Sequence, residues 1–203
     1  MSSRSSSMHL VFWEIQVTIP LKLVFKNPLA PKAFNLTNND ILRRIRYTFN
    51  CDDSKMMTIF ALGGRESTRA DISAWMKKDD DPGQLKLKDT QLAVFLNGLI
   101  TEKRGKKEGA QPDPEKRLGN NIIFVKLKIA LSLQAEDILA ILELVGFQLS
   151  KHELSAFFRK SGHKHYRECK DQVLRNFLHG LQLKYRGKEE SVSEFKWPEP
   201  EPK

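Results

Sequence analysis

Basic side chains recur along this chain at a constant spacing of 82 residues, and this regularity makes them the first candidates for chemistry. Contacts to phosphate need cations on a common face and accept either Lys or Arg. The pattern therefore indicates a surface for nucleic acid or another polyanion, although the solvated helix faces of a basic protein give a similar pattern. Eight positions are basic on both sides of the spacing: Arg44 and Lys126, Arg46 and Lys128, Arg69 and Lys151, Lys77 and Arg159, Lys78 and Lys160, Lys88 and Lys170, Arg104 and Arg186, and Lys106 and Lys188.

A subset of these cations is the predicted binding site. Replacing its four first-helix members, Arg44, Arg46, Lys126 and Lys128, with Gln is expected to weaken polyanion binding and to leave the melting temperature nearly unchanged. The acidic side chains that recur at the same spacing, such as Asp89 and Asp171, are assigned to helix caps instead. The predicted site comprises Arg44, Arg46, Lys77, Lys78, Arg104, Lys126, Lys128, Arg159, Lys160 and Arg186.

Other reactive side chains give weaker patterns. His163, His165 and Cys169 could be drawn as part of a zinc site, but the residues 82 positions earlier are Asp, Gly and Leu, so the repeated unit does not need a metal. The acidic run 79–81 lacks the spacing of a calcium loop. Phosphate-cradling, dinucleotide and nucleophile-turn motifs are absent from the sequence. We therefore expect no metal, no cofactor and no enzymatic activity.

Two further forms of nucleic-acid recognition are disfavoured by the sequence. Five residues, 63–67, separate two expected helices, whereas a helix-turn-helix uses a turn of three or four. Base stacking needs exposed aromatic rings, and Trp75, Phe95, Phe157 and Phe177 all fall on predicted core faces. A polyanion contact made mainly through phosphates is the form that these patterns favour.

The spacing of the cations belongs to an internal repeat. Residues 38–108 align with residues 120–190 without a gap, and 20 of the 71 aligned positions are identical. An internal repeat at a fixed offset predicts one structural unit formed twice. A feature present in both copies belongs to the unit, and a feature present in one copy needs its own explanation.

Four helices are predicted in each copy. Ile41, Leu42 and Ile45 form an apolar stripe on the first helix, and a second apolar run ends near Gly64. Thr68 opens the third helix and Asp89 the fourth, with Ser150 and Asp171 in the same places in the second copy. A glycine inside the fourth helix in both copies, Gly98 and Gly180, predicts a close backbone crossing.

The expected fold is all-α, with two tandem four-helix repeats packed as one compact body, because a copy of about 70 residues buries little surface alone. The predicted divisions are a poorly structured extension over 1–36, the first repeat over 37–108, a surface linker over 109–119, the second repeat over 120–190 and a disordered tail over 191–203. The proline and glycine content of the linker and tail motivates the last assignments.

Composition narrows the class of protein. The formal net charge is +9 at pH 7, which suits phosphate-bearing or acidic partners. The two cysteines, Cys51 and Cys169, are each replaced by Leu in the other copy and read as core residues in a reducing compartment. Glu14 and Lys22 interrupt the apolar N-terminal run, so it predicts neither a membrane span nor a signal peptide. We expect a cytoplasmic protein.

Several segments together resemble one protein family. NNDILRRIRYTF, WMKKDDD, FLNGLITEKRGK and HKHYRECKDQVLRNFLHGL are similar to the YehS-like bacterial proteins, domain-of-unknown-function family 1456, over about residues 36–190. The resemblance implies a small bacterial helical protein with two tandem copies and brings no catalytic residues. The leading hypothesis is a non-enzymatic binding module for RNA, DNA or another polyanion. The alternatives are a protein-protein interaction scaffold and an enzyme with no recognisable motif, and the expected partners are RNA, DNA or an acidic protein.

The resemblance also makes residues 1–35 look foreign to the repeat. Leu36 directly precedes the Thr-Asn-Asn-Asp segment, and a TTG or CTG start codon translated as internal would place a leucine there. We predict that the cellular protein begins at Leu36, initiated as Met. An intact-mass measurement on protein from its native host tests this prediction, and a mass that includes residues 1–35 would contradict it.

Overall fold

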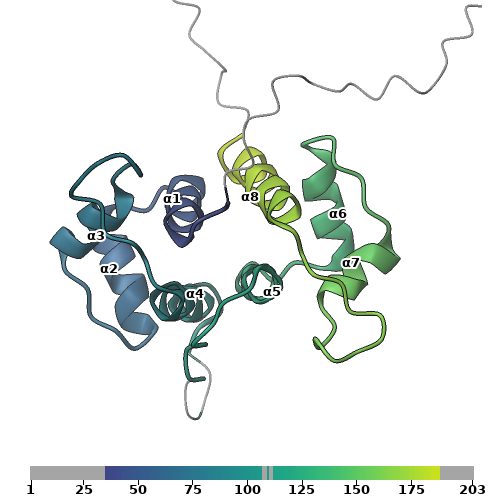
Figure 1. Ribbon diagram of the computed structural model, residues 1–203, viewed down its shortest axis with the longest axis horizontal. Coiled ribbons are helices and arrows are strands. Elements are labelled where there is room, and N and C mark those ends of the chain that lie inside the picture. The colour runs from purple at the N-terminus through teal and green to yellow at the C-terminus, as the bar shows by residue number, and fades with distance from the viewer. Residues whose placement is uncertain (1–34, 107–108, 110–111, 188–203) are drawn as a thin grey trace, which may run out of the picture. The chain divides into compact units, whose positions relative to one another are not determined.

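The computed structural model describes residues 35–106, 109 and 112–187, and the part it describes contains eight helices and no strand (Figure 1). The predictions for residues 1–34 and 191–203 lie outside the described residues. The helices follow one another as α1 (Asn38–Thr48), α2 (Asp53–Leu62), α3 (Arg69–Met76), α4 (Asp89–Arg104), α5 (Asn120–Ala130), α6 (Ala135–Glu143), α7 (Lys151–Phe157) and α8 (Asp171–Arg186).

The helix order confirms the tandem four-helix repeat. The bounds of α5 and α8 are those of α1 and α4 shifted by 82 residues, and α6 and α7 each differ from α2 and α3 by one residue at the C-terminal end. Each copy has its own aromatic core. Phe60 packs against Trp75 and Phe95 in the first copy, with ring centroids 5.1 Å apart in both pairs, and Phe124 packs against Phe177 at 4.3 Å in the second.

Capping side chains define several of the helix starts as the sequence predicts. Thr68 and Asp71 form a capping box at α3, and Ser150 and Glu153 form the equivalent box at α7. In such a box, a hydroxyl and a carboxylate satisfy amides that have no partner in the first turn. The assignment of Asp89 and Asp171 as caps is wrong, because α4 and α8 begin after Lys88 and Lys170.

The two aspartates instead connect the two copies. The Asp89 carboxylate accepts hydrogen bonds from Asn38 Nδ2 at 2.7 Å and from the backbone N–H of Leu118 at 3.0 Å. The Asp171 carboxylate accepts the equivalent bonds from Asn120 Nδ2 and from the N–H of Leu36, at 2.7 and 2.9 Å. These last two donors lower the pKa of Asp171. Each aspartate thus joins its own copy to the chain that enters the first helix of the other.

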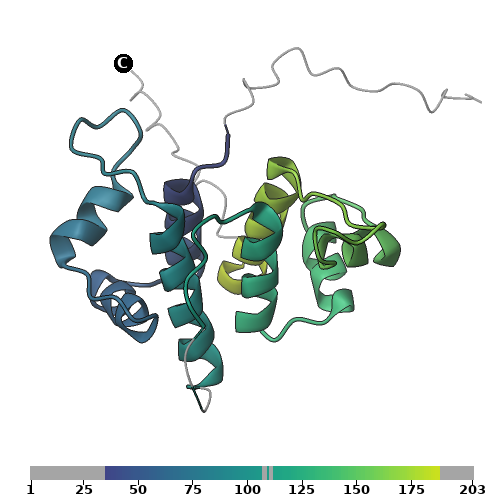
Figure 2. The ribbon, with the colours of Figure 1, turned by 60° about the horizontal axis from the view of Figure 1, so that its bottom comes forward.

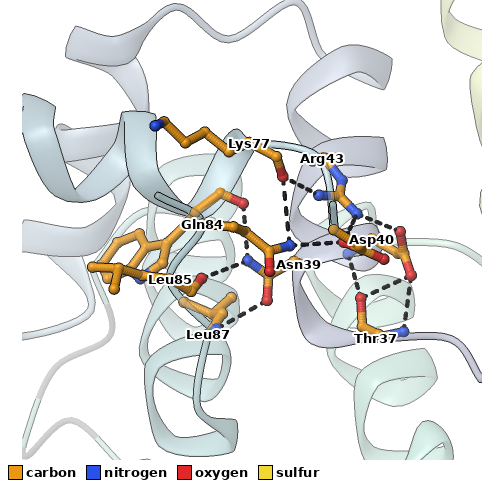
Figure 3. Close-up of polar contacts among 10 residues, drawn as sticks. Thr37, Asn39, Asp40, Arg43, Lys77, Gln84, Leu85 and Leu87 are labelled. Carbon is orange, nitrogen blue, oxygen red and sulfur yellow. Dashed lines mark hydrogen bonds and ion pairs between the residues drawn. The ribbon is translucent and has the colours of Figure 1, made fainter. Parts of the chain in front are cut away.

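The second asparagine of each copy organises the loop that follows α3 or α7. The Asn39 side-chain amide donates to the carbonyls of Trp75 and Leu85, both at 2.9 Å, and its oxygen accepts from the N–H of Leu87 at 2.9 Å (Figure 3). Asn121 makes the equivalent three contacts in the second copy. The repeated Asn-Asn pair is therefore a structural element of the unit.

The copies pack through their first and fourth helices. α4 lies against α5, and α1 lies against α8 (Figures 1 and 2). Each of these contacts therefore pairs the fourth helix of one copy with the first helix of the other. Leu36 and Leu118, which precede α1 and α5, join the core at this interface. Leu36 was assigned to the extension in the sequence-based division, and this boundary is corrected, because Leu36 packs with the repeats.

Within each copy the fourth helix crosses the second closely, as the paired glycines predict. A Cβ at Gly98 would lie 1.8 Å from the carbonyl oxygen of Ile59, and a Cβ at Gly180 would lie 2.2 Å from that of Ile141. No atom can occupy such a position without displacement of the backbone of the second helix. The glycine is the residue that permits α2 to pack against α4 and α6 against α8.

Replacing Gly98 or Gly180 with Ala should therefore destabilise the protein by at least about 1–3 kcal/mol, the range typical of overpacked cores. Gly162→Ala is the control, since a Cβ there meets nothing within 4 Å. Chemical denaturation of the three variants measures the effect. Equal stability of Gly98→Ala and Gly162→Ala would contradict the close crossing.

Candidate polyanion-binding groove

An open groove of about 860 Å³ lies at the C-terminal ends of α1, α4 and α8, beside the start of α2. We call it the tyrosine groove. Its wall is formed by residues of the first copy, together with Arg186 of the second copy. The lining side chains that bear on its chemistry are Arg43, Arg46, Tyr47, Phe49, Cys51, Asp52, Lys55, Glu102, Lys103 and Arg186.

Aromatic rings hold two cations at this groove. The Arg186 guanidinium lies over the Tyr47 ring at 4.0 Å, and it also donates to Asn50 Oδ1 at 3.5 Å. The Lys103 ammonium lies over the Phe49 ring at 5.1 Å. An ammonium or guanidinium is attracted to the negative face of an aromatic ring, and this contact keeps its charge. Both cations are therefore oriented without being neutralised by the ring.

Two tyrosines at this edge are unusually accessible. Tyr47 is 38% exposed and Tyr185, next to the groove, is 44% exposed. Phe49 and Tyr185 meet edge to face with ring centroids 5.3 Å apart. The sequence-based expectation of buried aromatics is correct for Trp75, Phe95, Phe157 and Phe177, which are all at most 6% exposed. It did not identify the two exposed tyrosines. The sequence feature that distinguishes them is a non-aromatic residue at the equivalent position of the other copy, Ile129 for Tyr47 and Lys103 for Tyr185.

Other cations of the groove belong to ion pairs. Arg46 pairs with Asp53 at 2.7 Å and donates to the Cys51 carbonyl. Arg43 contacts Asp40 at 2.6 Å and Asp79 at 2.9 Å, while Lys55 pairs with Glu102. Figure 3 shows Arg43 held between Asp40 and the Lys77 carbonyl. Among the described residues Lys103 makes no ion pair, and both Lys103 and Arg186 lie over an aromatic ring.

The structure brings only two of the ten predicted site residues, Arg46 and Arg186, into the tyrosine groove. Lys77 and Lys78 follow α3 while Arg159 and Lys160 follow α7, and the first and fourth helices of both copies separate these two places (Figure 1). The exposed Arg104 reaches the Ile129 carbonyl, and Lys128 lies over Phe158. The ten cations thus do not share one face.

Two of the predicted residues lie at the interface between the copies. Lys126 is 8% exposed, pairs with Glu115 at 2.9 Å and contacts Asn97 Oδ1. Arg44 is half-buried, and burial followed by the nearby charge of Arg175 lowers its pKa. In this arrangement Lys126 is a structural cation that is closed to a phosphate backbone.

Cys169 is 1% exposed, and burial raises the pKa of its thiol to about 12, so it fills the core as predicted. Among the described residues no three His, Cys, Asp or Glu side chains gather in a way that could hold a metal ion. Nor does any described helix combine the length and the apolar character that crossing a bilayer requires.

These features define a class of protein, in which two copies of a four-helix unit pack with the first helix of each copy against the fourth helix of the other. The chain belongs to the family described as "Protein of unknown function (DUF1456)", which matches residues 38–105 and again residues 120–187. It is similar to the "Uncharacterized protein YehS" of Escherichia coli (strain K12), at 47% identity over 147 residues that cover 72% of this chain and 94% of that protein. No solved structure matches the chain.

Because Lys126 is buried, the variant in which Arg44, Arg46, Lys126 and Lys128 are all replaced with Gln should now have a lower melting temperature than the wild type. Lys126→Gln should lower the free energy of unfolding by about 1–3 kcal/mol, because Glu115 and Asn97 lose a charged partner in a buried place. Lys78→Gln, at an exposed position, should change it by less than about 0.5 kcal/mol. Thermal melts of both variants measure the difference. If Lys126→Gln has the same melting temperature as the wild type, Lys126 is not a structural cation.

Proposed function

We propose that this protein is a non-enzymatic binding module for nucleic acid, and that the tyrosine groove contacts a single strand. The observation that carries the proposal is the pairing of accessible aromatic rings with ring-held cations in one groove. Proteins that bind single strands combine a positive groove for the backbone with aromatic rings on which bases stack. The tyrosine groove contains both elements within one hollow.

The asymmetry between the copies supports this assignment. Tyr47 and Phe49 have the aliphatic Ile129 and Leu131 as counterparts, and Lys103 has Tyr185, so this combination of two rings and a cation is not repeated in the sequence of the second copy. A feature needed only for packing would be expected in both copies. The set of aromatic and basic residues in the first copy therefore calls for a role outside the shared fold.

A binding role agrees better with this groove than catalysis does. Cys51 is the nucleophilic side chain that lines it, and burial raises the pKa of that thiol. A thiol with a raised pKa forms little of the reactive thiolate at neutral pH. The carboxylate of Glu102 is engaged by Lys55, which keeps it from serving as a free general base.

Fluorescence anisotropy with a labelled oligonucleotide of twelve uridines tests the proposal. Tyr47→Ala should weaken binding about tenfold, because one stacked base contributes about 1–3 kcal/mol. Arg186→Gln and Lys103→Gln should each lower the slope of log affinity against log salt by about one, because each cation releases one counterion. A duplex of the same length should bind more weakly, since its bases are already stacked.

The repeat provides matched controls for this experiment. Arg104 and Ile129 stand at the places of Arg186 and Tyr47 in the other copy, and Ile129 has the same 38% exposure as Tyr47. Arg104→Gln and Ile129→Ala should leave binding unchanged. If these controls weaken binding as much as the groove variants do, the site lies elsewhere. If no oligonucleotide binds, and a stoichiometric protein survives nuclease treatment in an affinity purification, a protein-binding scaffold replaces the proposal.

A further inference from the structure

The linker between the copies is held along α4 and α5 by polar contacts. Asn97 Nδ2 donates to the carbonyl of Pro112 at 3.4 Å, and Glu115 pairs with Lys126 at 2.9 Å. The same linker ends at Leu118, whose N–H donates to Asp89. Residues 112–118 are thus a docked segment, not only the surface connection that their composition predicts. The exposures of Asn97 and Lys126 are 6% and 8% where this segment lies.

By the 82-residue offset, the docking place on α4 and α5 corresponds to a place on α8 and α1. Asn97 becomes His179, which is exposed, and Lys126 becomes Arg44, which is half-buried. We call these two residues the α1–α8 cradle. Like the occupied place, the cradle carries a cation, and it lies where the first helix of one copy packs against the fourth helix of the other. It differs in that its polar side chains are more accessible than their buried counterparts.

The segment that precedes α1 does not supply the matching carboxylate. By the 82-residue offset, Glu115 corresponds to Ala33 and Asp113 corresponds to Pro31. Among the described residues Arg44 makes no ion pair, and the nearby carboxylate of Asp40 is paired with Arg43. A cation that is half-buried beside another cation is stabilised by a nearby carboxylate more strongly than an exposed one is, because less water screens the pair.

Residues 198–203 are similar in sequence to the docked linker. Pro198-Glu199-Pro200-Glu201-Pro202-Lys203 alternates proline with acids as Pro112-Asp113-Pro114-Glu115-Lys116 does. Alternating prolines favour an extended backbone, which lowers the entropy lost on docking. From Gly187 to Glu201 an extended chain can span up to about 45 Å, whereas His179 lies about 12 Å back along α8. The C-terminal segment is therefore long enough to reach the cradle.

We propose that the C-terminal segment 198–203 binds the α1–α8 cradle of its own chain, with Glu201 against Arg44 as Glu115 lies against Lys126. The cradle is then a site for an extended peptide of alternating proline and acidic residues. Docking there would cover Arg44 and His179 and give the two faces of the interface equivalent covers. This inference does not depend on nucleic-acid binding at the tyrosine groove.

Amide NMR spectra of the full chain test the proposal. Glu199→Gln/Glu201→Gln should shift the amide resonances of Arg44 and of the residues around His179. Glu189→Gln/Glu190→Gln removes the same charge closer to α8 and should leave the cradle resonances unchanged. The indole resonance of Trp197, next to the acidic segment, should move in His179→Ala and in Arg44→Glu. It should return when Arg44→Glu is combined with Glu199→Lys/Glu201→Lys.

Three results would overturn the proposal. Shifts confined to the C-terminal residues would show that the segment does not dock, and shifts at Tyr47 and Lys103 would place it on the tyrosine groove. Cradle shifts that depend on protein concentration would mean that the tail of a second chain is bound. Because His179 is exposed, His179→Ala keeps the test valid even if Arg44→Glu fails to fold.

Discussion

The packing of each fourth helix on the first helix of the other copy is the constraint on which the other features of this protein depend. Asp89 and Asp171 fix it at one end, because each carboxylate accepts from an asparagine of its own copy and from a backbone N–H that enters the other. Charge-assisted hydrogen bonds of this kind are stronger than neutral ones. Apolar burial between the helices supplies the rest of the association.

This reciprocal interface also explains why two nearly equivalent copies present different surfaces. Its central positions have to satisfy the same packing twice, and the Asp89 and Asp171 contacts are kept in both copies. Its edges meet solvent and are free to differ. Tyr47 and Arg186 face one end of the interface, where Ile129 and Arg104 stand at the other. The docked linker covers Lys126, and its counterpart Arg44 lies more open.

The electrostatics follow the same division. A net charge of +9 describes the whole chain, but the individual cations have distinct roles. Lys126 compensates a carboxylate inside the interface, and Arg46 pairs with Asp53 at the groove. Arg186 and Lys103 lie over aromatic rings, which orient them. Packing thus decides which of the positive charges are accessible, and residue type alone does not predict this.

The sequence by itself determined the helices, the repeat and the close crossing at Gly98 and Gly180, because apolar periodicity, capping residues and a gapless offset are local signals. Only the tertiary structure decided which cations are accessible. The sequence pattern around Arg44 and Lys126 does not differ from the pattern around an exposed cation on a helix. Lys126 is buried and Arg44 is half-buried because a helix of the other copy packs beside them. For the same reason, the sequence did not predict that the ring of Tyr47 is accessible. Exposure is a property of the packed interface, and no single helix encodes it.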